Sequence, residues 1–152
     1  MKNGRLKIAL VSSHGGHLAE LMEVMDAFAP NEYFFITYHG ETVADLKPAY
    51  FLKKFHDSAW GLFSIWFRVF RILRRERPDV VFSTGAEIAI PVFLVAKIFF
   101  GCKLAYLESA AQVSAPSLTG RVVYPFCDIF LVQWEGLLKK YGPNARYKGG
   151  LI

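Results

Sequence analysis

The chain has 152 residues, a length that suits one compact domain and is short for two. Hydrophobic residues make up 53% and charged residues 20% of it, which excludes a disordered protein and leaves apolar surface for a partner other than water. The net charge of +5 is concentrated between residues 68 and 77, beside an aromatic run, which favours an anionic membrane surface over nucleic acid.

We expect no metal centre, no cofactor and no disulfide framework. Cys102 and Cys127 lack the spacing of a zinc site or a CxxC pair, so a reducing cytoplasm fits. Residues 1–7 are polar and basic, unlike a signal peptide. No run reaches the roughly 18 apolar residues of a spanning helix.

Strands and helices alternate along the chain. Apolar runs predict strands at residues 6–12, 33–38, 51–55, 79–83, 103–107 and 128–132. Helical spacing predicts helices at residues 18–28 and 59–77, from the turn 84–87 to about 100, at 118–124 and at 134–141. Pro78 ends the second helix and Gly101 the third.

This alternation predicts one α/β domain over residues 1–152, with a Rossmann-like, mostly parallel sheet and helices on both faces. Such sheets bind ligands at the carboxyl ends of their strands. The candidate site is therefore the set of loops that follow the strands.

The first of these loops is a glycine-containing turn before the first helix, Ser13, His14, Gly15, Gly16 and His17. Glycines let the backbone approach a ligand, and a helix start offers free N–H groups to an anion such as a phosphate. His17 is either a general base or a neutral residue that positions the ligand. The alternative is a tight turn with incidental histidines.

Two further strand ends carry polar residues. Thr84, Gly85 and Glu87 follow one strand and either contact sugar hydroxyls or cap the next helix. Glu108, followed by Ser109, is a second candidate base; its structural alternative is an ion pair with Arg121.

The helix 59–77 has the pattern of an interfacial membrane helix. Ser64, Arg68, Arg71 and Arg75 form one polar stripe on an otherwise apolar cylinder. The residues expected to meet the membrane are Trp60, Phe63, Trp66, Phe67, Arg68, Phe70 and Arg71. Its apolar part, about 14 residues or roughly 21 Å, is too short to cross a bilayer. The alternative is a buried helix of the α/β fold.

Five motifs in order resemble the asparagine-linked glycosylation "fourteen" family of oligosaccharide biosynthesis proteins, which includes acceptor subunits of bacterial polysaccharide transferases. They are the turn 13–17, the stretch 78–87, Leu107-Glu108-Ser109, residues 117–121 and Val132-Gln133-Trp134. That family is similar to the N-terminal domain of MurG, a two-domain glycosyltransferase of the GT-B type.

The resemblance implies an acceptor-binding, peripheral subunit on the cytoplasmic face of the membrane. It would bind a polyprenyl-diphosphate-linked sugar, while a separate donor-binding subunit brings UDP-GlcNAc or a UDP-hexose. The glycine turn, with Thr84, Gly85, Glu87, Ser109 and Arg121, would hold the acceptor diphosphate and sugar, and His17 or Glu108 would take its proton. The tail 145–152 would dock the partner, through Gly150, Leu151 and Ile152, together with Gln133 and Trp134.

Two other functions stay open from the residues alone. One is a non-catalytic membrane adaptor that only recruits the catalytic partner. The other is a stand-alone nucleotide-binding protein, although the turn 13–17 has neither a GxGxxG fingerprint nor a Walker lysine.

Overall fold

The computed structural model describes residues 4–40, 45–53 and 59–151, and within the helix that starts at Ala59 it describes side chains from Phe63 onward. The strands are β1 (Lys7–Val11), β2 (Glu32–Tyr38), β3 (Ala49–Leu52), β4 (Val80–Ser83), β5 (Lys103–Leu107), β6 (Ile129–Val132) and β7 (Ala145–Tyr147). The α-helices are α1 (Gly16–Glu23), α2 (Ala59–Glu76), α3 (Ala89–Val95), α4 (Leu118–Val123) and α5 (Leu138–Tyr141).

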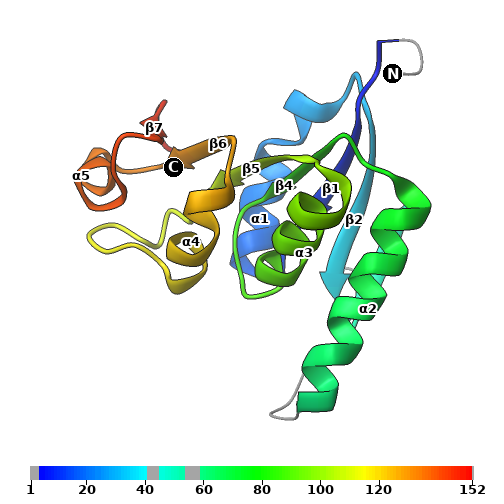
Figure 1. Ribbon diagram of the computed structural model, residues 1–152. Coiled ribbons are helices and arrows are strands. Elements are labelled where there is room, and N and C mark those ends of the chain that lie inside the picture. The colour runs from blue at the N-terminus through cyan, green and yellow to red at the C-terminus, as the bar shows by residue number, and fades with distance from the viewer. Residues whose placement is uncertain (1–3, 41–44, 54–58, 152) are drawn as a thin grey trace.

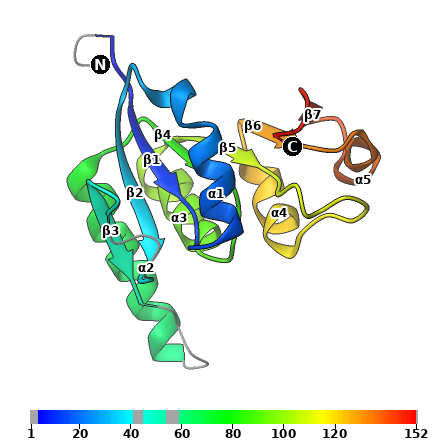
Figure 2. The same cartoon turned by 180° about the vertical axis from the view of Figure 1, so that it is seen from behind.

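The strands form a single parallel sheet with the order β3-β2-β1-β4-β5-β6-β7. The chain moves outward from β1 through β2 to β3, and then returns to place β4 on the other side of β1 (Figures 1 and 2). This reversal is the topological switch point of a doubly wound sheet, beside which such folds bind their ligands. The predicted Rossmann-like fold is confirmed.

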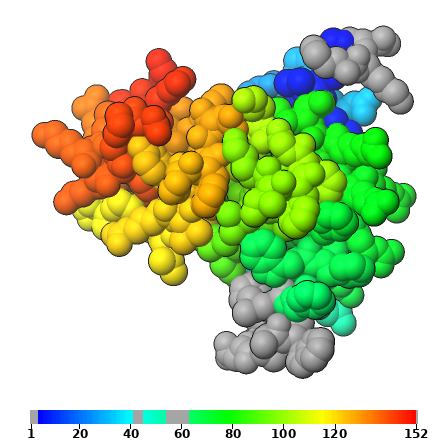
Figure 3. Space-filling view, in the orientation of Figure 1, coloured from blue at the N-terminus to red at the C-terminus, as the bar shows by residue number. Residues whose placement is uncertain are grey.

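Helices cover both faces of the sheet. Figure 2 shows α1 in front of β1, β4 and β5, where Leu18 and Leu21 pack on Ile8, Leu10 and Phe82. The opposite face carries α2, α3 and α4, which form one continuous surface in the space-filling view (Figure 3). Both faces of the central strands are therefore buried, which explains their continuous apolar runs.

Several element boundaries differ from the expected ones. The first helix ends at Glu23 and continues only as a 3₁₀ turn, η1 (Met25–Phe28); the third consists of α3 and a π-helical turn, η3 (Ala96–Phe100). Before α5 lies another 3₁₀ turn, η5 (Glu135–Leu137), and η4 (Tyr124–Phe126) follows α4. The strand expected at 51–55 lies at Ala49–Leu52, and residues 54–58 are outside the described part.

Strand β7 was not expected at all. It is three residues long and only Ala145 is buried, so its sequence has no alternating pattern. Its backbone pairs with β6 at Phe130, Leu131 and Val132 and completes the sheet at one edge.

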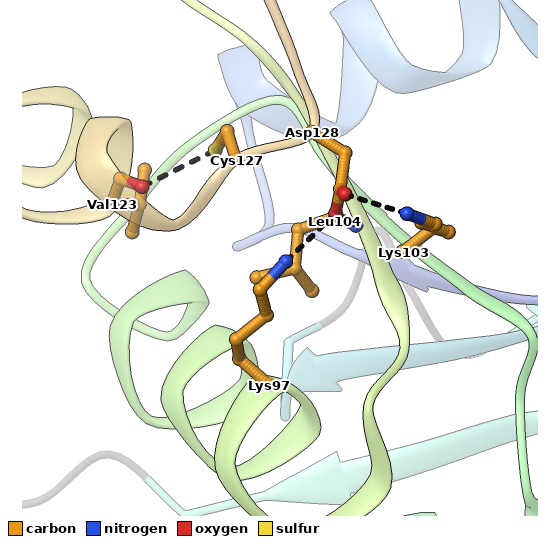
Figure 4. Close-up of polar contacts among 6 residues, drawn as sticks. All are labelled: Lys97, Lys103, Leu104, Val123, Cys127 and Asp128. Atoms are coloured by element: carbon orange, nitrogen blue, oxygen red, sulfur yellow. Dashed lines mark hydrogen bonds and ion pairs between the residues drawn. The ribbon is translucent and has the colours of Figure 1, made fainter.

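At the amino-terminal ends of the strands, Asp128 lies at the start of β6 and binds groups from β5 and from the helical turn before it (Figure 4). Its carboxylate accepts hydrogen bonds from Lys97 Nζ and Lys103 Nζ, both at 3.0 Å, and from the Leu104 N–H at 2.9 Å. Burial alone would raise the pKa of Asp128, but these donors and the Lys97 charge lower it to about 2. This cluster lies at the end of the sheet opposite to the site loops.

The two cysteines are free thiols. Cys127 donates to the Val123 carbonyl at 3.3 Å, and burial, together with the neighbouring Asp128 charge, raises its pKa to about 12 (Figure 4). A thiol with such a pKa is unreactive at neutral pH.

Candidate functional site

The turn between β1 and α1 is open on the side of its glycines. Gly15 adopts φ 88°, which favours glycine, and a Cβ at Gly15 or Gly16 would meet no atom of the described residues within 4 Å. No side chain caps α1, so N–H groups of its first turn stay available to a ligand. The turn therefore combines a close backbone approach with the positive end of a helix dipole.

His17 lies at the switch point, between β1 and β4. Its Nδ1 lies 3.0 Å from the Thr84 carbonyl oxygen, while the Thr84 hydroxyl donates to the His17 carbonyl at 2.6 Å. Because a carbonyl oxygen can only accept, Nδ1 carries the proton. In the neutral ring Nε2 is then the atom with the free lone pair, so His17 is held in the tautomer that a general base at Nε2 needs.

Gly85 makes this contact possible. It adopts φ 125°, and a Cβ there would lie 2.7 Å from His17 Cε1 and 2.8 Å from Nδ1. Any other residue at position 85 would both strain the backbone and displace the imidazole. Thr84 and Gly85 of the motif 84–87 thus fix the position of His17, which belongs to a turn far away in the sequence.

The expectation that Thr84 caps a helix is wrong. Thr84 is fully buried and its hydroxyl bonds to His17, while α3 begins only at Ala89 without a side-chain cap. Glu87 is exposed and interacts with Tyr38 at the end of β2; burial, the Glu87 charge and the hydrogen bond to Glu87 raise the Tyr38 pKa.

Ser13 and His14 complete the turn. The Ser13 hydroxyl donates to the His14 carbonyl at 3.3 Å. The His14 ring packs beside Gly40, because a Cβ at Gly40 would lie 3.0 to 3.4 Å from its ring and Cβ atoms. His14 thus sits at the carboxyl end of β2, one strand away from His17.

Glu108 ends β5 and is completely buried. Its Oε2 accepts hydrogen bonds from the Ser117 N–H at 3.1 Å, the Ser117 hydroxyl at 3.0 Å and the Tyr141 hydroxyl. Its Oε1 accepts from the Ser109 N–H at 3.1 Å. Burial, the hydrogen bond to Glu108 and the negative charge of Glu108 together raise the pKa of Tyr141. All of these partners are protein groups, so the carboxylate fixes the loop that follows β5.

Arg121 does not pair with Glu108. It lies exposed on α4, and the ion pairs among the described residues do not include it. The alternative that Glu108 forms a structural ion pair with Arg121 is therefore wrong. Hydrogen bonds from Ser117 and Tyr141 hold the carboxylate instead.

Sequence reasoning missed Glu20, which joins two of the strand-end loops. From α1, its Oε1 accepts hydrogen bonds from the Ser109 hydroxyl at 2.9 Å and the Ala110 N–H at 3.0 Å. Glu20 lies one helical turn after His17, and this spacing on a short helix was the available signal.

Gln133 and Trp134 hold the same loop from the end of β6. Gln133 Nε2 donates to the Glu108 carbonyl at 3.1 Å, and Trp134 Nε1 donates to the Ala110 carbonyl at 2.8 Å. Gln133 Oε1 also accepts from the Leu151 N–H at 2.9 Å, and Leu151 packs against the apolar cluster under α1. Gly150 is exposed, and Ile152 lies outside the described residues.

Helix α2 is neither fully interfacial nor fully buried. Its side chains Ile65, Val69 and Leu73 belong to the core, and Trp66 and Phe70 pack against that core. Phe63 and Phe67 are 68% and 56% exposed, and Arg68 and Arg71 are exposed too. The side chain of Trp60 lies outside the described part.

The first turns of α2 project past the carboxyl ends of the strands, at the end of the molecule where the turn 13–17 lies (Figures 1 and 2). Among the described helices, none is long and apolar enough to cross a membrane. Over the same residues, no group of three or more His, Cys, Asp or Glu side chains is arranged to hold a metal ion.

The strand order and the loops at the switch point define a Rossmann-like α/β domain. Residues 53–151, more than half of the chain, match the family described as "Oligosaccharide biosynthesis protein Alg14 like", and the chain belongs to this family.

The relatives in this family match either nearly the whole chain or a part of it. The chain is 27% identical to "UDP-N-acetylglucosamine transferase subunit ALG14" of Rattus norvegicus over 182 residues, covering 97% of this chain and 83% of the rat protein. It is 40% identical to the Schizosaccharomyces pombe protein of that name over 76 residues, covering 47% of this chain and 36% of the yeast protein.

Solved structures match the fold at low sequence identity. MurG of Acinetobacter baumannii has a TM-score of 0.77 at 14% identity, covering 95% of this chain and 46% of MurG. UDP-GlcNAc 2-epimerase of Methanocaldococcus jannaschii has a TM-score of 0.73 at 12% identity, covering 95% and 46%. The chain thus spans about half the length of the solved structures it matches.

Proposed function

We propose that the chain is the acceptor-binding subunit of a two-component, inverting UDP-sugar glycosyltransferase that extends a polyprenyl-diphosphate-linked saccharide. The observation that carries this proposal is the His17 imidazole at the switch point, with Nδ1 engaged by Thr84 and Nε2 free beside an uncapped helix start. The enzyme class and the donor follow from relatives named UDP-N-acetylglucosamine transferase subunits.

The chemistry assigns each part of the site a task. The acceptor diphosphate lies on the glycines of the turn 13–17 and on the N–H groups of α1. The acceptor hydroxyl attacks the anomeric carbon of the donor on the face opposite UDP. His17 Nε2 takes the hydroxyl proton while the new C–O bond forms and the bond to UDP breaks, which inverts the anomeric centre. The Thr84 carbonyl stabilises the imidazolium through Nδ1.

Between the two candidate bases, the geometry supports His17. The Glu108 carboxylate is buried and bonded at both oxygens, so a hydroxyl would have to displace a protein donor to reach it. We assign Glu108 the task of positioning Ser109 and the loop beyond it. Acceptor contacts are proposed for Ser13, His14, Gly15, Gly16, Glu87, Ser109 and Arg121. Thr84 and Gly85 are buried against His17 and act on the acceptor through that residue.

The donor half comes from a partner. The relatives are named transferase subunits, which supports a separate GT-B-like subunit that binds the UDP-sugar. The docking region is the edge strand β7 with the tail up to residue 152, and Gln133 and Trp134 connect this region to the loop after β5. UDP-GlcNAc is the first donor to test, because the relatives' names specify it.

A lipid-linked acceptor requires the subunit to sit on the membrane, at the cytoplasmic face. Phe63 and Phe67 are exposed on the first half of α2. The start of this helix projects past the carboxyl ends of the strands (Figure 1). Replacing both by Ser is expected to reduce flotation with vesicles. Trp66 and Phe70 are unsuitable for this test because they also pack on the core. Equal recovery of both proteins with vesicles would remove this part of the proposal.

Reconstitution tests the proposal. The chain is mixed with its donor-binding partner, radiolabelled UDP-GlcNAc and a short-chain polyprenyl-diphosphate-linked saccharide, and product is separated by chromatography. We expect transfer only when both subunits are present, and its loss in His17→Ala at unchanged partner affinity. Unchanged turnover in His17→Ala would support the adaptor function instead, and transfer by the partner alone would contradict the proposal.

A further inference from the structure

A groove runs between α2 and the edge strand β3. Its volume is about 840 Å³, within the range of about 300–1,000 Å³ typical of small-molecule sites. Its lining includes Arg68, Arg71, Arg74 and Arg75 from α2, with aromatic surface from Phe67 and Phe51. The arginines of the expected polar stripe, together with Arg74, therefore form one wall of a concave surface.

The charge of this groove is not balanced within the described part of the protein. No Asp or Glu belongs to its lining. Arg75 Nε lies 3.8 Å from Glu76, but the Glu76 carboxylate is already bound by Lys7 Nζ at 2.5 Å and by the Tyr50 hydroxyl. Arg68, Arg71 and Arg74 form no ion pair there.

Like charges three or four residues apart repel each other on a helix, so this arrangement costs stability unless an anion binds. Arginine is also the residue whose planar donors match phosphate oxygens in pairs. The groove therefore fits a phosphate group better than a diffuse cloud of counterions.

The groove opens beside exposed apolar surface. Phe63 and Phe67 stand on the same helix, more than half exposed, and the Arg71 guanidinium lies 6.0 Å from the Phe67 ring centre. A ligand that matches both parts carries a phosphate and, next to it, hydrocarbon chains. A soluble polyanion matches only the first part.

We propose that this groove binds the phosphate headgroup of an anionic phospholipid, with the acyl chains against Phe63 and Phe67. The inference rests on the proposed function in one respect, namely that the part of α2 with Phe63 and Phe67 meets the membrane. It adds a defined lipid site, separate from the site of the lipid-linked acceptor at the turn 13–17.

Vesicle co-sedimentation of the full chain tests this site. The probes are phosphatidylcholine vesicles with and without phosphatidylglycerol. The variant Arg68→Gln/Arg71→Gln/Arg74→Gln is compared with the charge-matched control Arg5→Gln/Lys139→Gln/Lys140→Gln, whose residues are exposed outside α2. We expect the groove variant to bind the anionic vesicles on the order of 100-fold more weakly, and the control to change less than about threefold. Equal losses in both would overturn the proposal.

A charge-conserving variant separates a built site from general attraction. Arg68→Lys/Arg71→Lys/Arg74→Lys keeps the charge but loses the paired donors, so we expect about a tenfold loss on anionic vesicles. Wild-type binding by this variant would contradict a headgroup site. Tighter binding of a single-stranded RNA than of the vesicles would assign the groove to nucleic acid and also overturn the proposal.

Failure of this inference is distinguishable from failure of the proposed function. With the partner and a short-chain acceptor in detergent, the glutamine variant is expected to transfer sugar at the wild-type rate. Loss of transfer there would place the arginines in the acceptor site and contradict a separate lipid site. Circular dichroism melting checks that the variants fold.

Discussion

Two strand-end loops at the same edge of the sheet carry a candidate base, and they differ in what surrounds it. Within the part of the chain that the structure describes, the turn after β1 has no neighbour at Gly15 and Gly16, and only Nδ1 of the His17 ring has a hydrogen-bond partner. The loop after β5 closes around Glu108, whose carboxylate is bonded by Ser109, Ser117 and Tyr141. One polar residue is available to a ligand and the other stabilises the scaffold, although both occupy equivalent places in the topology.

The largest expected effect is that of His17→Ala. Removing a general base costs about 10²- to 10⁴-fold in rate, so we expect kcat of the reconstituted pair to fall by this factor. Partner affinity, measured by calorimetry, should stay within about twofold. A loss of partner affinity that accounts for the missing activity would assign His17 a structural role like that of Glu108.

Glu108→Ala should act on stability and leave the chemistry intact. The substitution leaves the Ser117 and Tyr141 donors buried without an acceptor, so we expect urea denaturation to show a free energy of unfolding lower by about 3 kcal/mol. Turnover per folded molecule should stay close to that of the wild type below the melting temperature. A stably folded variant without activity would show that Glu108, like His17, is needed for the reaction.

Gly120→Ala tests how tightly the closed loop is packed. A Cβ there would collide with the Tyr141 hydroxyl and Glu108 Oε2, so we expect unfolding to become easier by about 2–3 kcal/mol. Gly136 is the matched control, because a Cβ at that position meets nothing within 4 Å. If Gly120→Ala and Gly136→Ala melt alike, the loop is not packed as described.

The smallest effect concerns Asp128, at the opposite end of the sheet. Its folded pKa of about 2 lies below the usual 3.8, so its stabilising contribution is present above pH 4 and is lost as the pH falls towards 2. Because Asp128 is exposed and solvent screens its ion pairs, we expect a contribution of about 1 kcal/mol or less. In urea denaturation Asp128→Asn should be less stable than wild type at pH 7 and should approach it at pH 2. A difference that is constant with pH would contradict the role of this carboxylate.

The succession of strands and helices along the chain and the turn 13–17 follow from local patterns. Apolar runs, Pro78 and Gly101 mark the elements, and a parallel sheet places the strand ends at one edge. The surroundings of Glu108 do not follow in this way, because Ser117 and Tyr141 lie 9 and 33 residues further along and reach it only through packing. Strand β7 escaped prediction for a similar reason, since pairing with β6 and not its own sequence defines it.

Ligand binding by the isolated chain tests the central claim most directly. Calorimetry compares a short-chain polyprenyl-diphosphate-linked saccharide with UDP-GlcNAc, each added to the chain without its partner. An acceptor-binding half is expected to bind the lipid-linked saccharide saturably, with weaker binding in Gly15→Val, and to show no binding of UDP-GlcNAc. Tight binding of UDP-GlcNAc, without binding of the lipid-linked saccharide, would contradict the account and identify a stand-alone nucleotide-binding protein.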